Sequence, residues 1–198
     1  MNDIPLPDPD KKRLSVCVFC GSSYGTNPAY AGTAKRLGEL LAASGYGLVF
    51  GGGNVGLMGE TARAARDGGV PVHGILPEFL KHLEPPLKAK EQVVITPDLQ
   101  TRKQLMLSMS AAFVVLPGGL GTLDEYFEVV TSAQLHVFGK PIVVVDIAGY
   151  YAPLITLLEH VVRQGFAKPE ALKLHHVVTT ADDAVATLNR LLVQPMKV

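Results

Sequence analysis

A chain of 198 residues with 47% apolar residues is long enough to form one globular domain with a substantial core. Its 18 basic and 18 acidic side chains balance, which argues against a protein that binds nucleic acid by neutralising phosphates. No apolar run approaches the roughly 18–20 residues that span a bilayer, so we expect no membrane-spanning helix and no membrane partner.

The N-terminal segment, residues 1–12, is polar and rich in Pro and Asp, and we expect a flexible tail there followed by a single domain over residues 13–198. The tail lacks the apolar segment of a secretion signal, which predicts a cytoplasmic location. Cys17 and Cys20 fit that reducing compartment as free thiols. Because residues three apart on a strand point to opposite faces, we expect these two to be buried strand residues and not a redox or metal pair.

Strands and helices alternate along the chain. Apolar runs predict strands at residues 14–20, 46–50, 70–76, 92–95, 111–116, 141–145 and 176–178. Helical spacing predicts four helices at about residues 28–44, 97–109, 151–164 and 181–193. Two further helices are predicted: one follows the second strand and ends near residue 67, and one follows the fifth strand and begins near residue 122. Strict alternation with uniformly apolar strands indicates an α/β protein. We expect a Rossmann-like, doubly wound, mostly parallel sheet of about seven strands flanked by helices.

Glycine-bearing turns follow the first, second and fifth predicted strands, at residues 21–25, 51–59 and 117–125. In an open parallel sheet these turns share the carboxyl edge, where ligands bind at the topological switch point. No acidic residue ends the strand after the second turn to hold a dinucleotide ribose, and the chain has no P-loop signature. The pattern therefore predicts a mononucleotide site.

The third turn joins a buried strand to the start of a helix, which is a favourable place for a phosphate. Glu125 follows Thr122 by three residues and so shares its helix face, where a carboxylate suggests chemistry beside the phosphate. From position alone, Glu125 could equally complement the helix dipole, and Arg102 and Lys103 could form a solvated helix face. Asp124 and Glu128 have the pattern of surface charges.

Three stretches, residues 117–125, Arg102-Lys103 and residues 51–59, give the chain its resemblance to a known family. The chain resembles the Lonely Guy family of cytokinin riboside 5′-monophosphate phosphoribohydrolases, from Cys20 to Phe166. The resemblance implies hydrolysis of the N-glycosidic bond of an N6-modified adenosine monophosphate, giving free base and ribose 5-phosphate without a cofactor. Many such relatives carry the label lysine decarboxylase, but no lysine here lies in a context typical of a pyridoxal phosphate site.

Glu125 and Arg102 are the catalytic candidates under this resemblance. A carboxylate stabilises positive charge at the ribose C1′ and activates water, and an arginine orients the carboxylate or the phosphate. The expected substrate contacts are Ser22, Gly53, Glu84, Lys103, Gly118, Gly119, Gly121, Thr122, Leu123, Asp124 and Thr131. The six histidines show no zinc-ligand spacing, so we expect no metal.

The chain departs from the family pattern in two places. Leu99-Gln100 stands where many members have Met-His, and Ser132 stands where many have Trp. Glu125 and Arg102 match the family pattern. The resemblance therefore predicts the type of reaction but leaves open which purine base the substrate carries. A general purine (AMP) mononucleotide nucleosidase and a nucleotide-binding carrier without turnover stay open as alternatives. The family also implies a homodimer, formed through the helices that carry Arg102 and follow Gly121.

Overall fold

The computed structural model describes residues 13–81 and 92–193, so the predicted tail over 1–12 and Glu84 lie outside the described residues. Seven parallel strands form one sheet in the order β4-β3-β2-β1-β5-β6-β7. The strands are β1 (Ser15–Phe19), β2 (Gly47–Phe50), β3 (Val72–Pro77), β4 (Gln92–Thr96), β5 (Ala112–Val115), β6 (Ile142–Val145) and β7 (His176–Val178). The predicted doubly wound fold is confirmed.

The helices occupy the predicted segments within a few residues. They are α1 (Ala29–Ala43), α2 (Gly56–Asp67), α3 (Leu99–Ser108), α4 (Leu120–Gln134), α5 (Ala152–Arg163) and α6 (Ala181–Val193). Three short 3₁₀ turns are η1 (Glu78–Leu80), η2 (Ile147–Gly149) and η3 (Pro169–Lys173).

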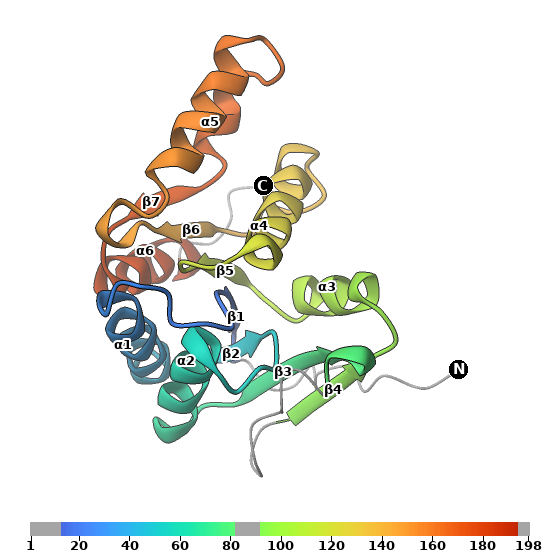
Figure 1. Cartoon of the computed structure of the whole chain (residues 1–198), viewed down its shortest axis with the longest axis vertical. Helices are drawn as coiled ribbons and strands as arrows, with labels where there is room; N and C mark the ends of the chain where they lie inside the picture. The colour runs from blue at the N-terminus through green and yellow to red at the C-terminus, as the bar shows by residue number, and fades with distance from the viewer. Residues whose placement is uncertain (1–12, 82–91, 194–198) are drawn as a thin grey trace.

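The helices cover both faces of the sheet (Figure 1). Side chains of α1, α2 and α6 pack on one face with Val16 and Val18, and side chains of α3, α4 and α5 pack on the other with Cys17 and Phe19. Because each central strand is buried on both sides, its sequence is apolar throughout and does not alternate. Cys17 and Cys20 are buried, form no disulfide and pack on opposite faces of the sheet, as predicted.

The switch point of the sheet lies between β1 and β5. The chain leaves β1 through α1 on one face and leaves β5 through α4 on the other (Figure 1). In open α/β sheets the carboxyl ends of two such strands border the ligand-binding crevice. The first and third glycine turns follow these strands. Tertiary structure thus places both turns where an open α/β sheet binds its ligand.

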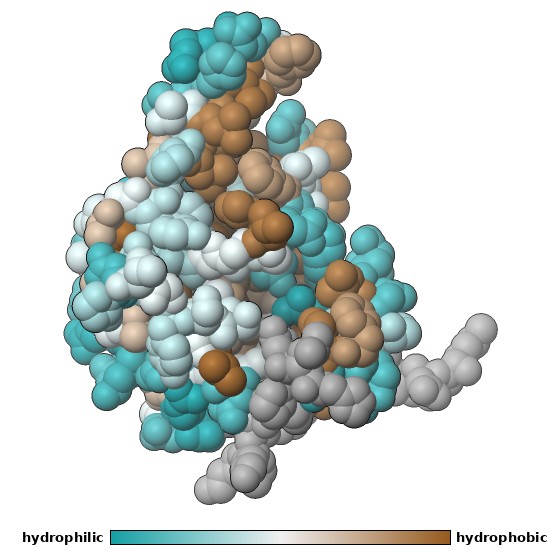
Figure 2. Space-filling model, viewed as in Figure 1, coloured by the Kyte–Doolittle hydropathy of each residue, from teal (hydrophilic) through white to brown (hydrophobic). Residues whose placement is uncertain are grey.

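Apolar side chains gather on the outer surface of α4 and α5. α5 has no fully buried residue and projects from the body of the molecule in Figure 1. Figure 2 shows apolar residues over both helices. The exposed ones, here called the apolar surface, include Phe127, Leu135, Val137, Leu157 and Phe166. Along the described chain, every helix is too short or too polar to cross a membrane.

Candidate active site

Gly21, in the first glycine turn, is hydrogen-bonded to both of the other glycine turns. Its N–H donates to the carbonyl of Pro117 at 3.0 Å, which joins the first turn to the third. Its own carbonyl accepts from the N–H groups of Leu57 at 3.0 Å and Met58 at 3.2 Å, which joins the first turn to the start of α2. The predicted convergence of these turns on one sheet edge is confirmed.

The N-terminus of α4 differs from those of α2 and α3. The first N–H groups of α2 bond to Gly21, and α3 is capped by Asp98, whose carboxylate accepts from the Thr101 N–H at 2.7 Å. That bond lowers the pKa of Asp98. α4 begins at Leu120, and its N-cap residue Gly119 has no side chain to form a capping hydrogen bond. Its first-turn N–H groups, which have no acceptor within the helix, are therefore the ones suited to an anion.

Glycines in the third turn serve two different purposes. A Cβ added at Gly119 or Gly121 would meet no heavy atom within 4 Å, so the space before the helix start is open. A Cβ added at Gly118 would overlap the Thr122 hydroxyl and lie 2.8 Å from the Gly21 nitrogen. Gly118 thus permits close packing of the turn, and Gly119 and Gly121 leave room for a ligand.

Arg102 and Glu125 form a largely buried ion pair behind this turn. The distance from Arg102 Nη1 to Glu125 Oε1 is 3.3 Å, and the side chains are 12% and 8% exposed. The guanidinium also donates through Nε to the Ile75 carbonyl at 3.1 Å and through Nη2 to the Gly51 carbonyl at 3.5 Å. Buried charges need such partners, and these contacts hold the arginine between α4 and the ends of β2 and β3.

The second glycine turn makes room for Arg102. A Cβ at Gly51 would overlap the Arg102 Nη2 atom and lie 2.9 Å from the Met58 sulfur, so a side chain there would displace the guanidinium. Gly53, an expected substrate contact, is buried within the same turn. The described contacts of the second turn therefore support the arginine and the neighbouring Gly21.

Cys17 lies on the sheet face beneath α4. Burial, with the nearby Glu125 carboxylate, raises the pKa of the Cys17 thiol well above its usual value. The neutral thiol packs as a small apolar side chain next to the Arg102–Glu125 ion pair. It is a poor nucleophile, because the reactive form of cysteine is the thiolate.

Lys103 joins α3 to α4. Its ammonium lies 3.1 Å from the Asp124 carboxylate and 2.8 Å from the Glu128 carboxylate, and the bond to Glu128 raises the Lys103 pKa. The expectation for Glu128 as a plain surface charge is wrong, because Lys103 pairs with it and its side chain is only 21% exposed. Asp124 is 60% exposed, as a surface charge should be.

The remaining expected contacts are spread over the site and beyond it. Ser22 is exposed in the first turn, and Leu123 packs partly into the core of its sheet face. Thr131 is exposed on α4, nine residues after Thr122, which is about 13 Å further along the helix axis. A single chain therefore does not bring Thr131 to the glycine turn.

A pocket of about 190 Å³ opens in the crevice between the first and third turns. Its walls include Tyr24, Tyr30 and Tyr150 beside Gly118 and Gly119. The rings of Tyr30 and Tyr150 meet edge-on at 5.7 Å. Sequence analysis missed these tyrosines, although Tyr150 follows a strand at the same sheet edge.

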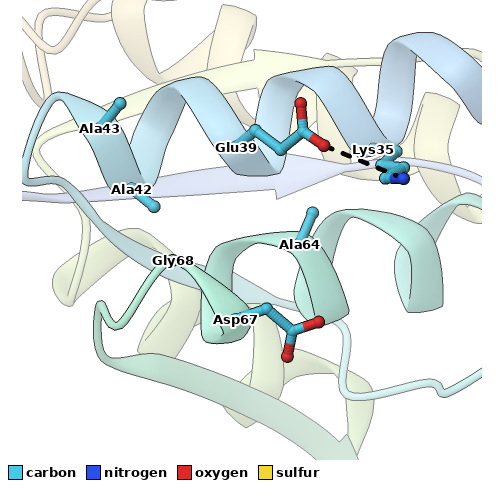
Figure 3. A pocket seen from close by; sticks show the side chains of 7 residues that line it. All are labelled: Lys35, Glu39, Ala42, Ala43, Ala64, Asp67 and Gly68. Atoms are coloured by element: carbon cyan, nitrogen blue, oxygen red, sulfur yellow. Dashed lines mark ion pairs between the residues drawn. The ribbon is translucent and has the colours of Figure 1, made fainter.

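A second hollow, of about 390 Å³, lies between α1 and α2 and includes the Lys35–Glu39 ion pair at 4.0 Å (Figure 3). α1 runs from the end of β1 back to the start of β2, so Ala42 and Ala43 at its end lie near the amino edge of the sheet. This hollow is therefore separate from the glycine turns.

Rossmann-like proteins bind nucleotides at the switch point of their sheet, and the glycine turns of this chain lie there with the Glu125 carboxylate beside them. A family model described as "Possible lysine decarboxylase" matches residues 58–188. The Arabidopsis thaliana cytokinin riboside 5′-monophosphate phosphoribohydrolase LOG3 is 40% identical over 173 residues, 87% of this chain and 80% of the relative. The probable rice enzyme LOGL2 (Oryza sativa subsp. japonica) is 41% identical over 166 residues, 84% of this chain and 67% of the relative. The chain belongs to the Lonely Guy (LOG) family, which confirms the resemblance.

Solved structures share the fold. The molybdenum cofactor binding protein of Rippkaea orientalis superposes with a TM-score of 0.68 at 20% identity, over 92% of this chain and 99% of the other. The molybdenum cofactor carrier protein of Chlamydomonas reinhardtii has the same TM-score at 23% identity, over 91% and 98%. At these identities the likeness is one of fold alone.

The lysine decarboxylase description does not fit the lysine beside this site. Amino-acid decarboxylation on pyridoxal phosphate needs a lysine that can become a neutral amine and form a Schiff base. Lys103 is paired with two carboxylates that favour its charged form. Within residues 13–81 and 92–193, no group of three or more His, Cys, Asp or Glu side chains could hold a metal ion.

Proposed function

We propose that this protein hydrolyses the N-glycosidic bond of cytokinin riboside 5′-monophosphates and releases the free cytokinin base and ribose 5-phosphate. The observation that carries the proposal is the Arg102–Glu125 ion pair, which lies directly behind the uncapped glycine start of α4. Relatives at 40–41% identity, whose names state this activity, support it.

The proposed reaction starts with the 5′-phosphate bound at the N–H groups of Gly119 and the first turn of α4, beside Gly118, Gly121 and Thr122. Anchoring the phosphate holds the ribose so that C1′ lies near Glu125. The bond from C1′ to the base nitrogen breaks, its electron pair leaves with the base, and positive charge develops on the ribose. Glu125 stabilises that charge and takes a proton from the water that attacks C1′. The departing base nitrogen takes up a proton from solvent and Glu125 returns its own to solvent, so that one water is consumed for each base and ribose 5-phosphate released.

Arg102 has an orienting role in this scheme. Its contacts with the Ile75 and Gly51 carbonyls fix the guanidinium, and the guanidinium in turn fixes the Glu125 carboxylate. A carboxylate held in one place needs little reorganisation when charge develops at C1′.

The two departures from the family pattern lie on different helices. Leu99 is 45% exposed at the start of α3, and Ser132 lies on α4 one residue after Thr131. We propose that Leu99, with Ser22, Gly53, Lys103, Leu123 and Asp124, receives the base and ribose, and that Ser132 belongs to the subunit contact proposed below. Glu84 belongs to the same proposal but lies outside the described residues.

Hydrolysis is tested by incubating the purified protein with isopentenyladenosine monophosphate and, separately, with AMP, while free base and ribose 5-phosphate are followed. We expect release from the first substrate with the higher kcat/KM. Equal kcat/KM for both would indicate a general purine mononucleotide nucleosidase. Binding of both nucleotides without release of base would indicate a carrier and contradict the enzyme proposal.

We also propose a homodimer. Sequence analysis expected its interface on the helices that carry Arg102 and follow Gly121, which are α3 and α4; because the apolar surface extends over α4 and α5, we propose that these two helices form the interface. Leu135 is 68%, Val137 71% and Phe166 87% exposed in one chain, and a second copy would remove these side chains from water. The dimer would also place the exposed Thr131 of α4 in an interface. The cytoplasmic location stays a prediction.

The dimer is tested with the double variant Leu135→Asp, Leu157→Asp, which adds two charges to the apolar surface. Wild-type protein is expected to have twice the 21.1 kDa mass of one chain by light scattering, and the variant the mass of one. Leu14→Asp alters a leucine that is 44% exposed beside β1 and serves as the control that remains dimeric. A monomeric wild type, or a dimeric double variant, would contradict the proposal.

A further inference from the structure

Three consecutive carbonyls at the start of the third glycine turn, beginning with that of Leu116 just before it, each accept a hydrogen bond from another part of the chain. The Leu116 carbonyl accepts from the Tyr151 hydroxyl at 2.7 Å. The Pro117 carbonyl accepts from the Gly21 N–H at 3.0 Å. The Gly118 carbonyl accepts from the Tyr150 hydroxyl at 2.5 Å.

These bonds set the direction of the N–H groups that follow. In a trans peptide unit the C=O and the next N–H point in opposite directions, and none of the described peptide bonds is cis. A Gly118 carbonyl held toward Tyr150 therefore turns the Gly119 N–H away from Tyr150. Glycine allows many backbone conformations, so an outside contact is needed to keep one of them.

The segment that carries the two tyrosines is itself well anchored. The Tyr151 N–H donates to the Asp146 carboxylate at 2.6 Å, and the Tyr151 ring is 1% exposed. Burial raises the pKa of Tyr151, so its hydroxyl stays a donor at physiological pH. The Tyr150 ring contacts Tyr151 edge-on at 4.9 Å and Tyr30 at 5.7 Å, which holds its hydroxyl in place above Gly118.

We propose that Tyr150 is a positioning residue for the phosphate of the substrate. Its hydroxyl holds the Gly118 carbonyl and so keeps the Gly119 N–H directed at the 5′-phosphate, while the Tyr151 hydroxyl fixes the peptide unit between Leu116 and Pro117. The inference rests on the proposed nucleotide hydrolysis and adds a residue that lies beyond the Pro117–Glu125 motif. Phosphate contacts exist in both the bound substrate and the transition state, so Tyr150 acts mainly on affinity.

The variant Tyr150→Phe removes the hydroxyl and keeps the ring. We expect its Kd for ribose 5-phosphate, measured by calorimetry, to rise about 3- to 10-fold, which corresponds to the net worth of one hydrogen bond. The KM for the nucleotide should rise by a similar factor while kcat changes little. The Kd for the free base, which has no phosphate, should stay as in the wild type.

Tyr46→Phe is the matched control, because the Tyr46 hydroxyl donates to Asn189 at 2.8 Å away from the glycine turns. It should leave both affinities unchanged. An unchanged Kd for ribose 5-phosphate in Tyr150→Phe would overturn the inference, and so would an equal loss of affinity for the free base, which indicates general disruption. A wild type that binds no ribose 5-phosphate would overturn this inference and the proposed function together, whereas the first two results leave the function standing.

Discussion

Glu125→Gln is expected to lower kcat for hydrolysis of isopentenyladenosine monophosphate by about 10³-fold, within the range for loss of a general base that also stabilises charge. The amide has nearly the shape of the carboxylate, but it carries no charge and takes no proton from water. Its oxygen can still accept from Arg102, so the fold should persist. Release of ribose 5-phosphate under saturating substrate measures the effect, and circular dichroism checks the fold.

The control for this variant is Glu39→Gln. Glu39 is also a helix carboxylate with an arginine partner, at 3.8 Å from Arg36, but it lies on α1 at the hollow between α1 and α2, which is separate from the glycine turns. It should keep wild-type kcat. The Kd of Glu125→Gln for ribose 5-phosphate should stay within a few-fold of the wild type, because the phosphate site is unaltered. Near-full turnover by Glu125→Gln would rule out the proposed mechanism.

Arg102→Ala should both abolish turnover and destabilise the protein. It leaves Glu125 buried without its cation and removes the donor from the Ile75 and Gly51 carbonyls. Removing one partner of a buried ion pair lowers the free energy of unfolding, here by about 3 kcal/mol. We take the low end of the usual range because both side chains keep some exposure. For a chain of this length that corresponds to a fall in Tm of roughly 6–12 °C, measured by thermal unfolding, with the native fold retained at 25 °C.

Two comparisons isolate the ion pair as the cause. In a Glu125→Gln background, the further change Arg102→Ala should lower Tm by less than it does in the wild type, since the glutamine carries no charge that would be left buried and unpaired. Arg36→Ala breaks a solvent-exposed pair with Asp182 at 2.7 Å and should leave Tm nearly unchanged. Equal losses of Tm for Arg102→Ala in both backgrounds would show that the pair contributes nothing specific.

The elements of this fold could be predicted from local sequence. Runs such as residues 111–116 are apolar at every position because helices cover both faces of the sheet, and few other structures need that pattern. The glycine turn before α4 and the position of Glu125 on its first turns were also predictable, because both depend on spacing within one segment. The parallel order of the strands then followed from their alternation with helices.

Only the tertiary structure decided what holds this site together. Arg102 lies on α3 and Glu125 on α4, and their contact depends on the order of the strands between them and on the carbonyls of Gly51 and Ile75. Tyr150 and Tyr151 reach the third turn from the loop after β6, and no local pattern marks a hydroxyl that bonds to a distant carbonyl. Hydrogen bonds between segments far apart in sequence depend on which sheet edge and which face each segment reaches. The sequence by itself therefore determined the helices and strands and the place of Glu125 beside the glycine turn. The packing at the sheet edge determined that Arg102 pairs with Glu125 and that Tyr150 and Tyr151 bond to the start of the turn.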